Sequence, residues 1–350
     1  MSSSEWVCPL PHRVNETVTL SHGAGGKLSA ELVDQVFLPA YGNEVLEGKS
    51  DSGEFAAPEA LGRFAITTDS FVVKPLFFPG GDLGSLAVYG TMNDLAVQGA
   101  KGLALTAAWI IEEGFSIGEL RRLAESVGKA ARECGIRILA ADTKVIERQR
   151  GDGCYLTTSG VGWIRDGIEL GVSKIRASDC VLLSGTIAEH GMAVMAFRDH
   201  LAFDPPLESD CSALWSMLDL LLQRVPGIRV MRDPTRGGIA ASLNEFAVAT
   251  DLCFRIQEEA IPIRPQVQRA CELLGIDPWV VANEGKVLIV IAKEDVDVAL
   301  QVLRDHPLGR ESAVIGYVDE THRGRVVAET RFRTQRVVPM PTGELLPRIC

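Results

Sequence analysis

The sequence predicts an α/β (α+β) protein of two domains, and three observations support this prediction. The chain has 350 residues, which is long for one hydrophobic core and suits two domains of ordinary size. Its 46% hydrophobic and 23% charged residues are typical of a folded globular protein. Helix and strand patterns alternate in two runs, which the polar stretch 165–179 separates. We therefore expect domains at 15–168 and 169–335, with an N-terminal extension (1–14) and a flexible tail (336–350).

The elements of the first run follow from apolar segments rich in β-formers and from one capping signal. Ser116 and Glu119 have the spacing of a capping box, which satisfies the first free N–H groups of a helix. Apolar residues then recur at helical spacing until Gly135, where the helix should end. Strands are predicted at residues 17–20, 64–73, 103–111, 136–141 and 155–164.

The second run repeats this alternation and contains no short-period repeat. Two strands are predicted at 181–184 and 286–292, and helices near 208–224 and 294–305. A further helix should begin at Gly237.

Composition and charge exclude several classes of protein. The net charge of −11, with no basic run to offset it, argues against nucleic acid as a partner. No apolar segment of a secretory signal is visible, and stretches such as 102–111 are too short to cross a bilayer. The eight cysteines are scattered without zinc-site spacing, so most are interpreted as small hydrophobic residues in a reducing compartment. We expect a cytoplasmic protein with no membrane contact.

The last residue, Cys350, ends a segment that is unlike a folded element. Pro339, Pro341 and Pro347 each lack an N–H group and favour extended backbone. Fully stretched, the segment from Pro339 onward spans roughly 40 Å at about 3.3–3.6 Å per residue. A thiolate is a strong nucleophile and a good carrier of acyl-type groups, so Cys350 is a candidate reactive residue on a mobile arm. The alternative is a stray cysteine on a frayed chain end.

Five acidic residues of the first half are candidates for a cation site. They are Asp51, Asp69, Asp82, Asp94 and Asp142. Several follow predicted strands or precede helices, and clustered carboxylates repel one another unless a cation such as Mg²⁺ neutralises them. The alternative for any one of them is a turn or a helix cap, and Asp82 is the strongest case, since it precedes a helix that would begin at Leu83.

Two glycine-rich segments are candidates for phosphate binding. Gly23, Gly25, Gly26 and Lys27 follow the predicted strand 17–20, and backbone N–H groups in such a loop can approach phosphate oxygens. The segment matches neither a P-loop nor a dinucleotide fingerprint, and a plain turn is the alternative. In the second half, the segment 232–238 ends in two glycines that can open an anion-binding helix or serve a tight turn. Glu284, in a loop before a strand, is a candidate general base or a solvated carboxylate.

Together these segments resemble one family. The blocks Ser21-His-Gly-Ala-Gly-Gly-Lys, Thr67-Thr-Asp-Ser, Phe77-Phe-Pro-Gly-Gly-Asp, Gly90-Thr-Met-Asn-Asp, Ala141-Asp-Thr-Lys, Arg232-Asp-Pro-Thr-Arg-Gly-Gly, Ala282-Asn-Glu-Gly-Lys and the terminal Pro-Arg-Ile-Cys are similar to those of the HypE family of hydrogenase maturation factors. That family belongs to a superfamily with aminoimidazole ribonucleotide synthetase, selenophosphate synthetase and thiamine-monophosphate kinase. The resemblance covers nearly the whole chain, and the match around Asp51 is the loosest.

The resemblance implies a fold and an activity. It implies an aminoimidazole ribonucleotide synthetase-like fold, whose N-terminal domain pairs with a second copy in a homodimer. A HypF-like carbamoyltransferase would load a carbamoyl group on Cys350, and this protein would use ATP to dehydrate it to a thiocyanate. The cyano group would then pass to iron on a HypC–HypD complex, for a nickel–iron hydrogenase.

The resemblance also implies roles for particular residues. Lys144 and Glu284 would handle protons beside Cys350. Mg²⁺ would be held by Asp51, Asp69, Asp94 and Asp142. The nucleotide would contact Gly23, Gly25, Gly26, Lys27, Asp69, Asp82, Asn93, Asp94 and Asp142. The alternatives are another enzyme of the superfamily, which phosphorylates a diffusible substrate, and a non-catalytic carrier.

Overall fold

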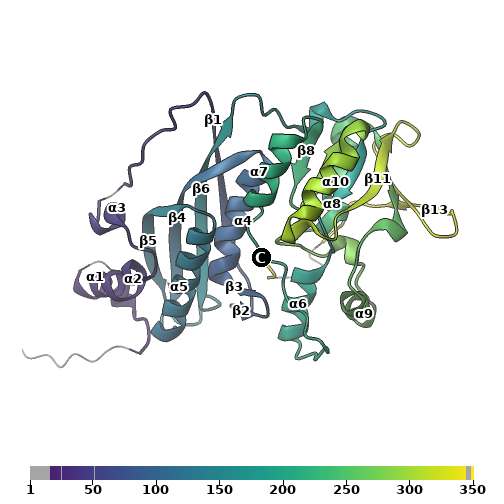
Figure 1. Ribbon diagram of the computed structural model, residues 1–350. Coiled ribbons are helices and arrows are strands. Elements are labelled where there is room, and N and C mark those ends of the chain that lie inside the picture. The colour runs from purple at the N-terminus through teal and green to yellow at the C-terminus, as the bar shows by residue number, and fades with distance from the viewer. Residues whose placement is uncertain (1–15, 25, 51, 344–347) are drawn as a thin grey trace, which may run out of the picture.

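Two large β-sheets, of four and seven strands, lie side by side in the described part of the chain, each with its own covering helices (Figure 1). The computed structural model describes residues 16–24, 26–50, 52–343 and 348–350. The first half (purple to blue) holds the four-stranded sheet, and the second half (green to yellow) holds the seven-stranded sheet. The C-terminus lies between the two halves. A mixed α/β architecture with two layered units is therefore confirmed.

The first sheet has the strand order β1-β6-β4-β5. Its strands, and a two-stranded ribbon, are β1 (Gly62–Phe71), β2 (Phe77–Phe78), β3 (Gly81–Asp82), β4 (Ala100–Glu112), β5 (Arg137–Ile146) and β6 (Cys154–Arg165). The helices of this half are α1 (Lys27–Leu32), α2 (Leu38–Tyr41), α3 (Glu44–Glu47), α4 (Leu83–Val97) and α5 (Ile117–Glu133). Helices α4 and α5 pack against each other and on one face of the sheet.

The opposite face of this sheet carries apolar side chains that none of the described residues covers. Phe64 and Ile66 of β1 are 55% and 78% exposed, and Ile110 of β4 is 39% exposed. Apolar side chains at this exposure, grouped on one sheet face, are typical of a surface that another molecule covers.

The second sheet has the strand order β13-β12-β9-β11-β7-β10-β8, and only β9 and β12 pair in parallel. Its strands are β7 (Cys180–Leu183), β8 (Ile228–Arg232), β9 (Cys253–Gln257), β10 (Leu288–Ile291), β11 (Ala313–Asp319), β12 (Val326–Glu329) and β13 (Gln335–Val338). Its helices are α6 (Glu189–Arg198), α7 (Trp215–Arg224), α8 (Gly238–Thr250), α9 (Pro265–Leu274) and α10 (Val296–Asp305). Neighbouring residues of β10 enter different cores: Ile289 joins the cluster of α7 and α10, and Val290 joins that of α8. The sheet is therefore buried on both faces at β10, which explains why every residue of this strand is apolar.

Helix α4 joins the two halves, since it packs on β1, β4 and β6 and also contacts α7 and β8. Asp82 is its N-cap, and the carboxylate accepts a hydrogen bond from the Ser85 N–H at 2.9 Å. Gly84 allows the close approach to α5, because a Cβ there would lie 2.4 Å from the Leu123 carbonyl oxygen. The alternative of a helix cap for Asp82 is thus confirmed.

Three local predictions differ from the structure. The strand at 17–20 is wrong: Thr17 forms one bridge with Ser116, and Leu20–His22 is a 3-10 turn closed by the His22 ring on the Thr19 N–H. The helix predicted from 208 begins only at Trp215, because backbone groups before it form hydrogen bonds with other segments. The Leu214 N–H, for example, donates to the Asn93 side chain. Residues 336–338, assigned to the tail, lie in β13, which pairs with β12.

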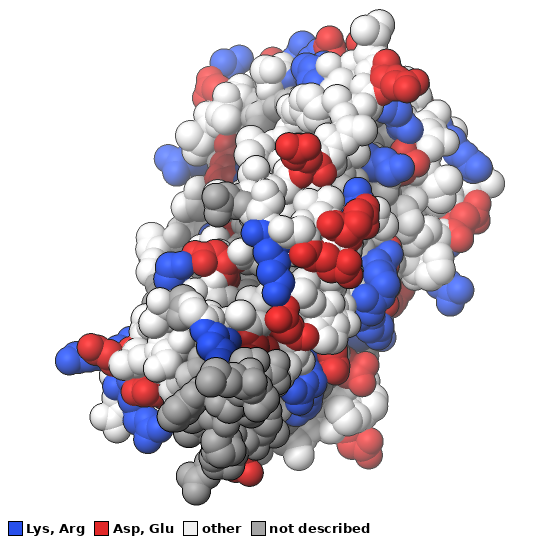
Figure 2. Space-filling model, turned by 90° about the vertical axis from the view of Figure 1, so that its left-hand side faces the viewer, with Lys and Arg blue, Asp and Glu red and all other residues white. Residues whose placement is uncertain are grey.

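Charged side chains of both signs are interspersed on the face shown in Figure 2, where Lys and Arg do not gather in one patch. Among the residues that the structure describes, no helix has both the length and the apolar character needed to cross a bilayer.

Candidate functional site

The end of the chain lies in a small cavity between the two halves. The cavity measures about 50 Å³, and its lining includes Asp69 of β1, Asp94 of α4, Asp233 after β8, Glu284 before β10, and Cys350. Cys350 also lines an adjoining cavity of about 510 Å³. The structure thus brings together four of the residues that the sequence predicts for the site, from elements up to 281 positions apart in the chain.

The carboxyl groups of this cavity are crowded, and the pKa values of Asp69, Asp233 and Glu284 are raised. Burial, together with the Asp94 carboxylate, raises the pKa of Asp69 from 3.8 to about 6 and that of Asp233 to about 7. Thr67 donates a hydrogen bond to Asp94 at 2.7 Å. Burial raises the pKa of Glu284 well above its usual value, and the surrounding carboxylates add to the effect. The cavity therefore favours a cation or a protonated group.

Glu284 has the properties of a residue prepared for proton transfer. Its side chain is 3% exposed, and its Oε1 atom has no hydrogen-bond partner within the described part of the chain. Gly90 of α4 lies beside this carboxyl group, since a Cβ there would be in ordinary contact, 3.9 Å, with the Glu284 Oε2 atom. The Cys350 thiol lines the same cavity. Burial raises the pKa of this thiol to about 12, and the Glu284 carboxylate adds to the effect. A buried carboxyl group of high pKa beside a thiol is a candidate acid or base.

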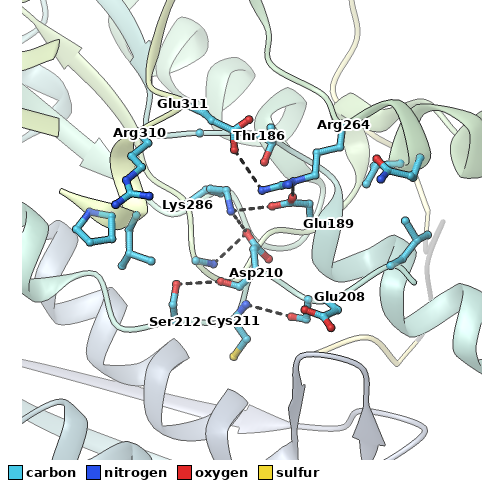
Figure 3. Close-up of a pocket in the computed structure, with 18 of the residues that line it drawn as sticks. Thr186, Glu189, Glu208, Asp210, Cys211, Ser212, Arg264, Lys286, Arg310 and Glu311 are labelled. Atoms are coloured by element: carbon cyan, nitrogen blue, oxygen red, sulfur yellow. Dashed lines mark hydrogen bonds and ion pairs between the residues drawn. The ribbon is translucent and has the colours of Figure 1, made fainter. Parts of the chain in front are cut away.

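Asp210, which lines a second pocket, binds the backbone of the loop that carries Glu284 (Figure 3). Asp210 accepts the backbone N–H groups of Glu284 at 3.1 Å and of Gly285 at 3.2 Å. Lys286 donates to Asp210 at 3.1 Å and to Glu189 at 2.9 Å, and Figure 3 shows the chain of ion pairs continuing outward. This buried network fixes the position of the Glu284 backbone.

Asn93 holds the same loop from the side of α4. Its amide donates to the carbonyl oxygens of Ser212 at 2.9 Å and Glu284 at 3.1 Å, and its Oδ1 atom accepts the Leu214 N–H at 2.9 Å. The side chain is 2% exposed. Asn93 thus bonds protein groups with both ends of its amide. The Asp82 side chain also bonds a protein group, since it caps α4.

Asp142 and Lys144 do not join this cluster within one chain. They pair with each other at 2.6 Å and are 62% and 63% exposed. Ser70, Thr157, Ala108 and Asp142 are successive partners across the sheet, so Asp142 shares the uncovered face of Ser70. Asp69 instead pairs with Thr158, whose hydroxyl bonds Thr91 of α4. Asp69 and Asp142 therefore lie on opposite faces, three strands apart.

The glycine-rich loop lies beside Asp142 and Lys144. All of Gly23, Gly26, Asp142 and Lys144 line a cavity of about 650 Å³ at the β5 edge. Gly23 packs so closely on β5 that a Cβ would lie 2.6 Å from the Val145 nitrogen. Lys27 is exposed and pairs with Glu31 at 3.6 Å. Gly25 and Asp51, also predicted for the site, lie outside the described residues.

The donor set of the Asp69–Asp94 cavity fits Mg²⁺, although the described residues contain no group of three ligating side chains arranged around one point. Mg²⁺ keeps several waters and commonly takes one or two carboxylates together with substrate phosphates. Two neighbouring carboxyl groups, one of them with a raised pKa, suit this pattern.

Sequence reasoning missed four residues of the site: Asp233, Asp210, His190 and Arg236. Asp233 directly follows β8, and a position directly after a predicted strand had also marked Asp142. Arg236, in the motif 232–238, lines both cavities at Cys350. For Asp210 and His190 the sequence carries no signal, because each acts on a segment more than 70 residues away.

The fold and the site define a protein of the AIR synthase related class. Residues 54–164 match the AIR synthase related N-terminal domain, and residues 176–329 match the corresponding C-terminal domain. The chain is 48% identical over 333 residues to the carbamoyl dehydratase HypE of Cupriavidus necator, which covers 95% of each protein. The chain therefore belongs to the HypE family of enzymes.

Two solved structures show the same likeness. One is a hydrogenase maturation protein HypE in complex with ATP, with a TM-score of 0.90, 38% identity, and coverage of 95% of this chain and 99% of that one. The other is a HypE–HypF complex, with a TM-score of 0.78, 42% identity, and coverage of 89% of this chain and 99% of that one.

Proposed function

We propose that this protein uses ATP to dehydrate a carbamoyl group on its own Cys350, which becomes a thiocyanate. The observation that carries this proposal is the shared cavity of Cys350 and Glu284, a thiol at the chain end beside a buried carboxyl group. A diffusible substrate would require a binding site where the chain instead inserts its own last residue.

The reaction balances without a further co-reactant. The S-carbamoyl oxygen attacks the γ-phosphate of ATP, and ADP leaves. Loss of the remaining nitrogen protons then expels phosphate and forms the C≡N bond, so that the net products are S-cyanocysteine, ADP and phosphate. An amide oxygen is a poor leaving group, and phosphorylation makes it a good one, which explains the requirement for ATP.

The described residues suit these steps. The ionised form of Glu284 is a base that burial strengthens, and it is suited to take a proton from the carbamoyl nitrogen. Asp69 and Asp94 would hold Mg²⁺, and this ion would supply positive charge against the phosphates and the crowded carboxylates. Arg236 lines the cavity at Cys350 and can bond phosphate oxygens.

We further propose that two copies pair through the uncovered face of the first sheet. Phe64 and Ile66 give this face an apolar surface, and Asp142 and Lys144 share it. Pairing would bury the apolar side chains. It would also bring Asp142 and Lys144 of the second copy toward the nucleotide-binding site of the first. Such pairing reconciles the predicted role of Lys144 with its distance from Glu284 in one chain.

The partners are proposed by the same reasoning. The solved HypE–HypF complex supports a HypF-like enzyme as the source of the carbamoyl group. An iron-carrying complex of the HypC–HypD kind would accept the cyano group. The seven cysteines of the described chain are free thiols, which is consistent with a reducing compartment such as the cytoplasm.

Intact-mass spectrometry tests the proposal. After incubation with a HypF-like carbamoyltransferase and its carbamoyl donor, and before Mg-ATP is supplied to the isolated adduct, the protein should gain one carbamoyl group at Cys350. Subsequent Mg-ATP should remove the mass of one water. A Glu284→Gln variant should accept the carbamoyl group but retain it. A carbamoyl adduct that ATP leaves unchanged in the wild type would indicate a carrier, and modification elsewhere than Cys350 would refute the assignment.

A further inference from the structure

The last three residues are held by the body of the protein through their backbone. The Arg348 carbonyl accepts the Lys74 N–H at 3.0 Å and an Arg198 guanidinium N–H at 2.7 Å. The Ile349 carbonyl accepts a hydrogen bond from the His190 Nε2 atom at 2.6 Å. Both carbonyls that precede Cys350 are therefore bonded to residues of other elements.

His190 contacts the chain end from inside the protein, where its ring has no access to solvent. Its ring, on α6, is fully buried. Since a carbonyl only accepts, the Nε2 atom carries the proton, and the Nδ1 atom accepts the Ser209 hydroxyl at 2.8 Å. The Phe78 ring packs against the imidazole edge-on, with centroids 5.4 Å apart. If the Ile349 carbonyl left, the buried Nε2–H would lose its protein partner.

Two further contacts set the register of the chain end. The Ile349 side chain is 4% exposed and belongs to the main hydrophobic core. The Arg348 guanidinium pairs with Asp152 at 2.6 Å. With Ile349 buried and its carbonyl bonded, the next residue is directed into the cavity of Glu284.

We propose that His190 is a positioning residue that holds the chain end in the site and sets how often Cys350 is released. This inference rests on the proposed function, in which Cys350 is loaded on another enzyme and must therefore leave its cavity and return. Arg198 and the Ile349 side chain act in the same direction. One buried donor is suited to this task, because it is satisfied only when the chain end is docked.

Thiol alkylation measures release without ATP or any partner. We expect docked Cys350 to react slowly at pH 8, because burial and the Glu284 carboxylate raise its pKa to about 12. A released thiol has a pKa near 8.5, so its thiolate is about a thousandfold more abundant. Iodoacetamide at limiting concentration, followed by peptide mass mapping, therefore reports the released fraction at Cys350. Buried Cys154 and Cys271 report loosening of the whole fold.

The variants are His190→Ala, His190→Gln and Ile349→Ala, with Arg224→Gln as an exposed control. Loss of one hydrogen bond should raise the alkylation rate of Cys350 about fivefold in His190→Ala. His190→Gln keeps an N–H donor and should remain nearer the wild type. Ile349→Ala should raise the rate at least as much, and Arg224→Gln should leave it unchanged. Cys154 and Cys271 should stay unreactive throughout.

Equal Cys350 rates in the wild type and His190→Ala would overturn the proposal. If His190→Ala also exposes Cys154 and Cys271, the decision falls to Ile349→Ala and Arg198→Gln, and unchanged Cys350 rates in both would refute it. The proposed function is tested separately, because a protein that never forms thiocyanate can still show this pattern of alkylation.

Discussion

Replacing Asp233 by Asn should stabilise the protein at alkaline pH when no nucleotide or metal is bound. Burial and Asp94 raise the pKa of Asp233 from 3.8 to about 7. The folded state therefore keeps a proton that the unfolded state releases, and stability falls as the pH rises from about 4 to about 7. Below pH 4 both states are protonated and the effect vanishes. Asn resembles the protonated acid and has no charge to bury.

The size of the effect follows from the shift. Each pKa unit corresponds to about 1.4 kcal/mol, so ionisation of Asp233 destabilises the fold by about 4 kcal/mol above pH 7. About 2.5 kcal/mol of this develops between pH 5 and pH 8. A chain of 350 residues unfolds with an entropy of about 0.7 kcal/mol per kelvin, so the Tm gap between variant and wild type should widen by about 3–4 °C over that range.

Differential scanning calorimetry in EDTA, at several pH values, measures this gap. Asp166→Asn, which removes an exposed carboxylate just after β6, is the matched control and should follow the wild type. Adding Mg-ATP should reverse the order, because a bound cation stabilises the ionised wild-type cluster more than the variant. Wild-type and variant Tm curves that run parallel from pH 5 to pH 8 without ligand would refute the reasoning.

Three further predictions concern the surrounding framework. Lys144→Ala should leave Tm within about 1 °C, since the ion pair of Lys144 is exposed. Calorimetric titration should show at least severalfold weaker ATP binding. Unchanged affinity would remove Lys144 from the nucleotide site. Asp210→Asn should lower kcat at least tenfold and Tm by several degrees. It leaves Lys286 with only Glu189 as a partner and weakens the hydrogen bond to the Glu284 backbone. Glu311→Gln, at the exposed end of the same network, should change neither kcat nor Tm in parallel assays. Ile66→Arg should convert a dimer to a monomer in analytical ultracentrifugation, since it places a charge on the uncovered face; a monomeric wild type, or a dimeric variant, would contradict pairing through this face.

Local sequence signals predicted much of the secondary structure and part of the site. Ser116 accepts the Glu119 N–H at 3.3 Å and starts α5 as its spacing indicates. Asp82 caps α4, and Gly237, with φ of 78°, allows the turn before α8. These signals act within a few residues, so the sequence displays them directly. The same locality explains the failure at 208–214, where distant partners replace the bonds of a helix.

The terminal Cys350 was also evident from the sequence, but its surroundings were not. A chain end rich in proline indicates an extended arm, and it says nothing of a receiving surface. Only the tertiary structure shows Ile349 buried in the core and its carbonyl on His190, 159 positions away.

The sequence by itself supplied most of the candidate residues, because carboxylates, glycines and a terminal thiol are defined by their type and immediate neighbours. The tertiary structure alone decided which of them share a site. Asp69 lies level with Ala141, through Thr158 and Ala107, and Asp142 is the next residue of β5. Because side chains alternate along a strand, that offset of one residue sends Asp142 to the face opposite Asp69, and only the register of the sheet fixes it.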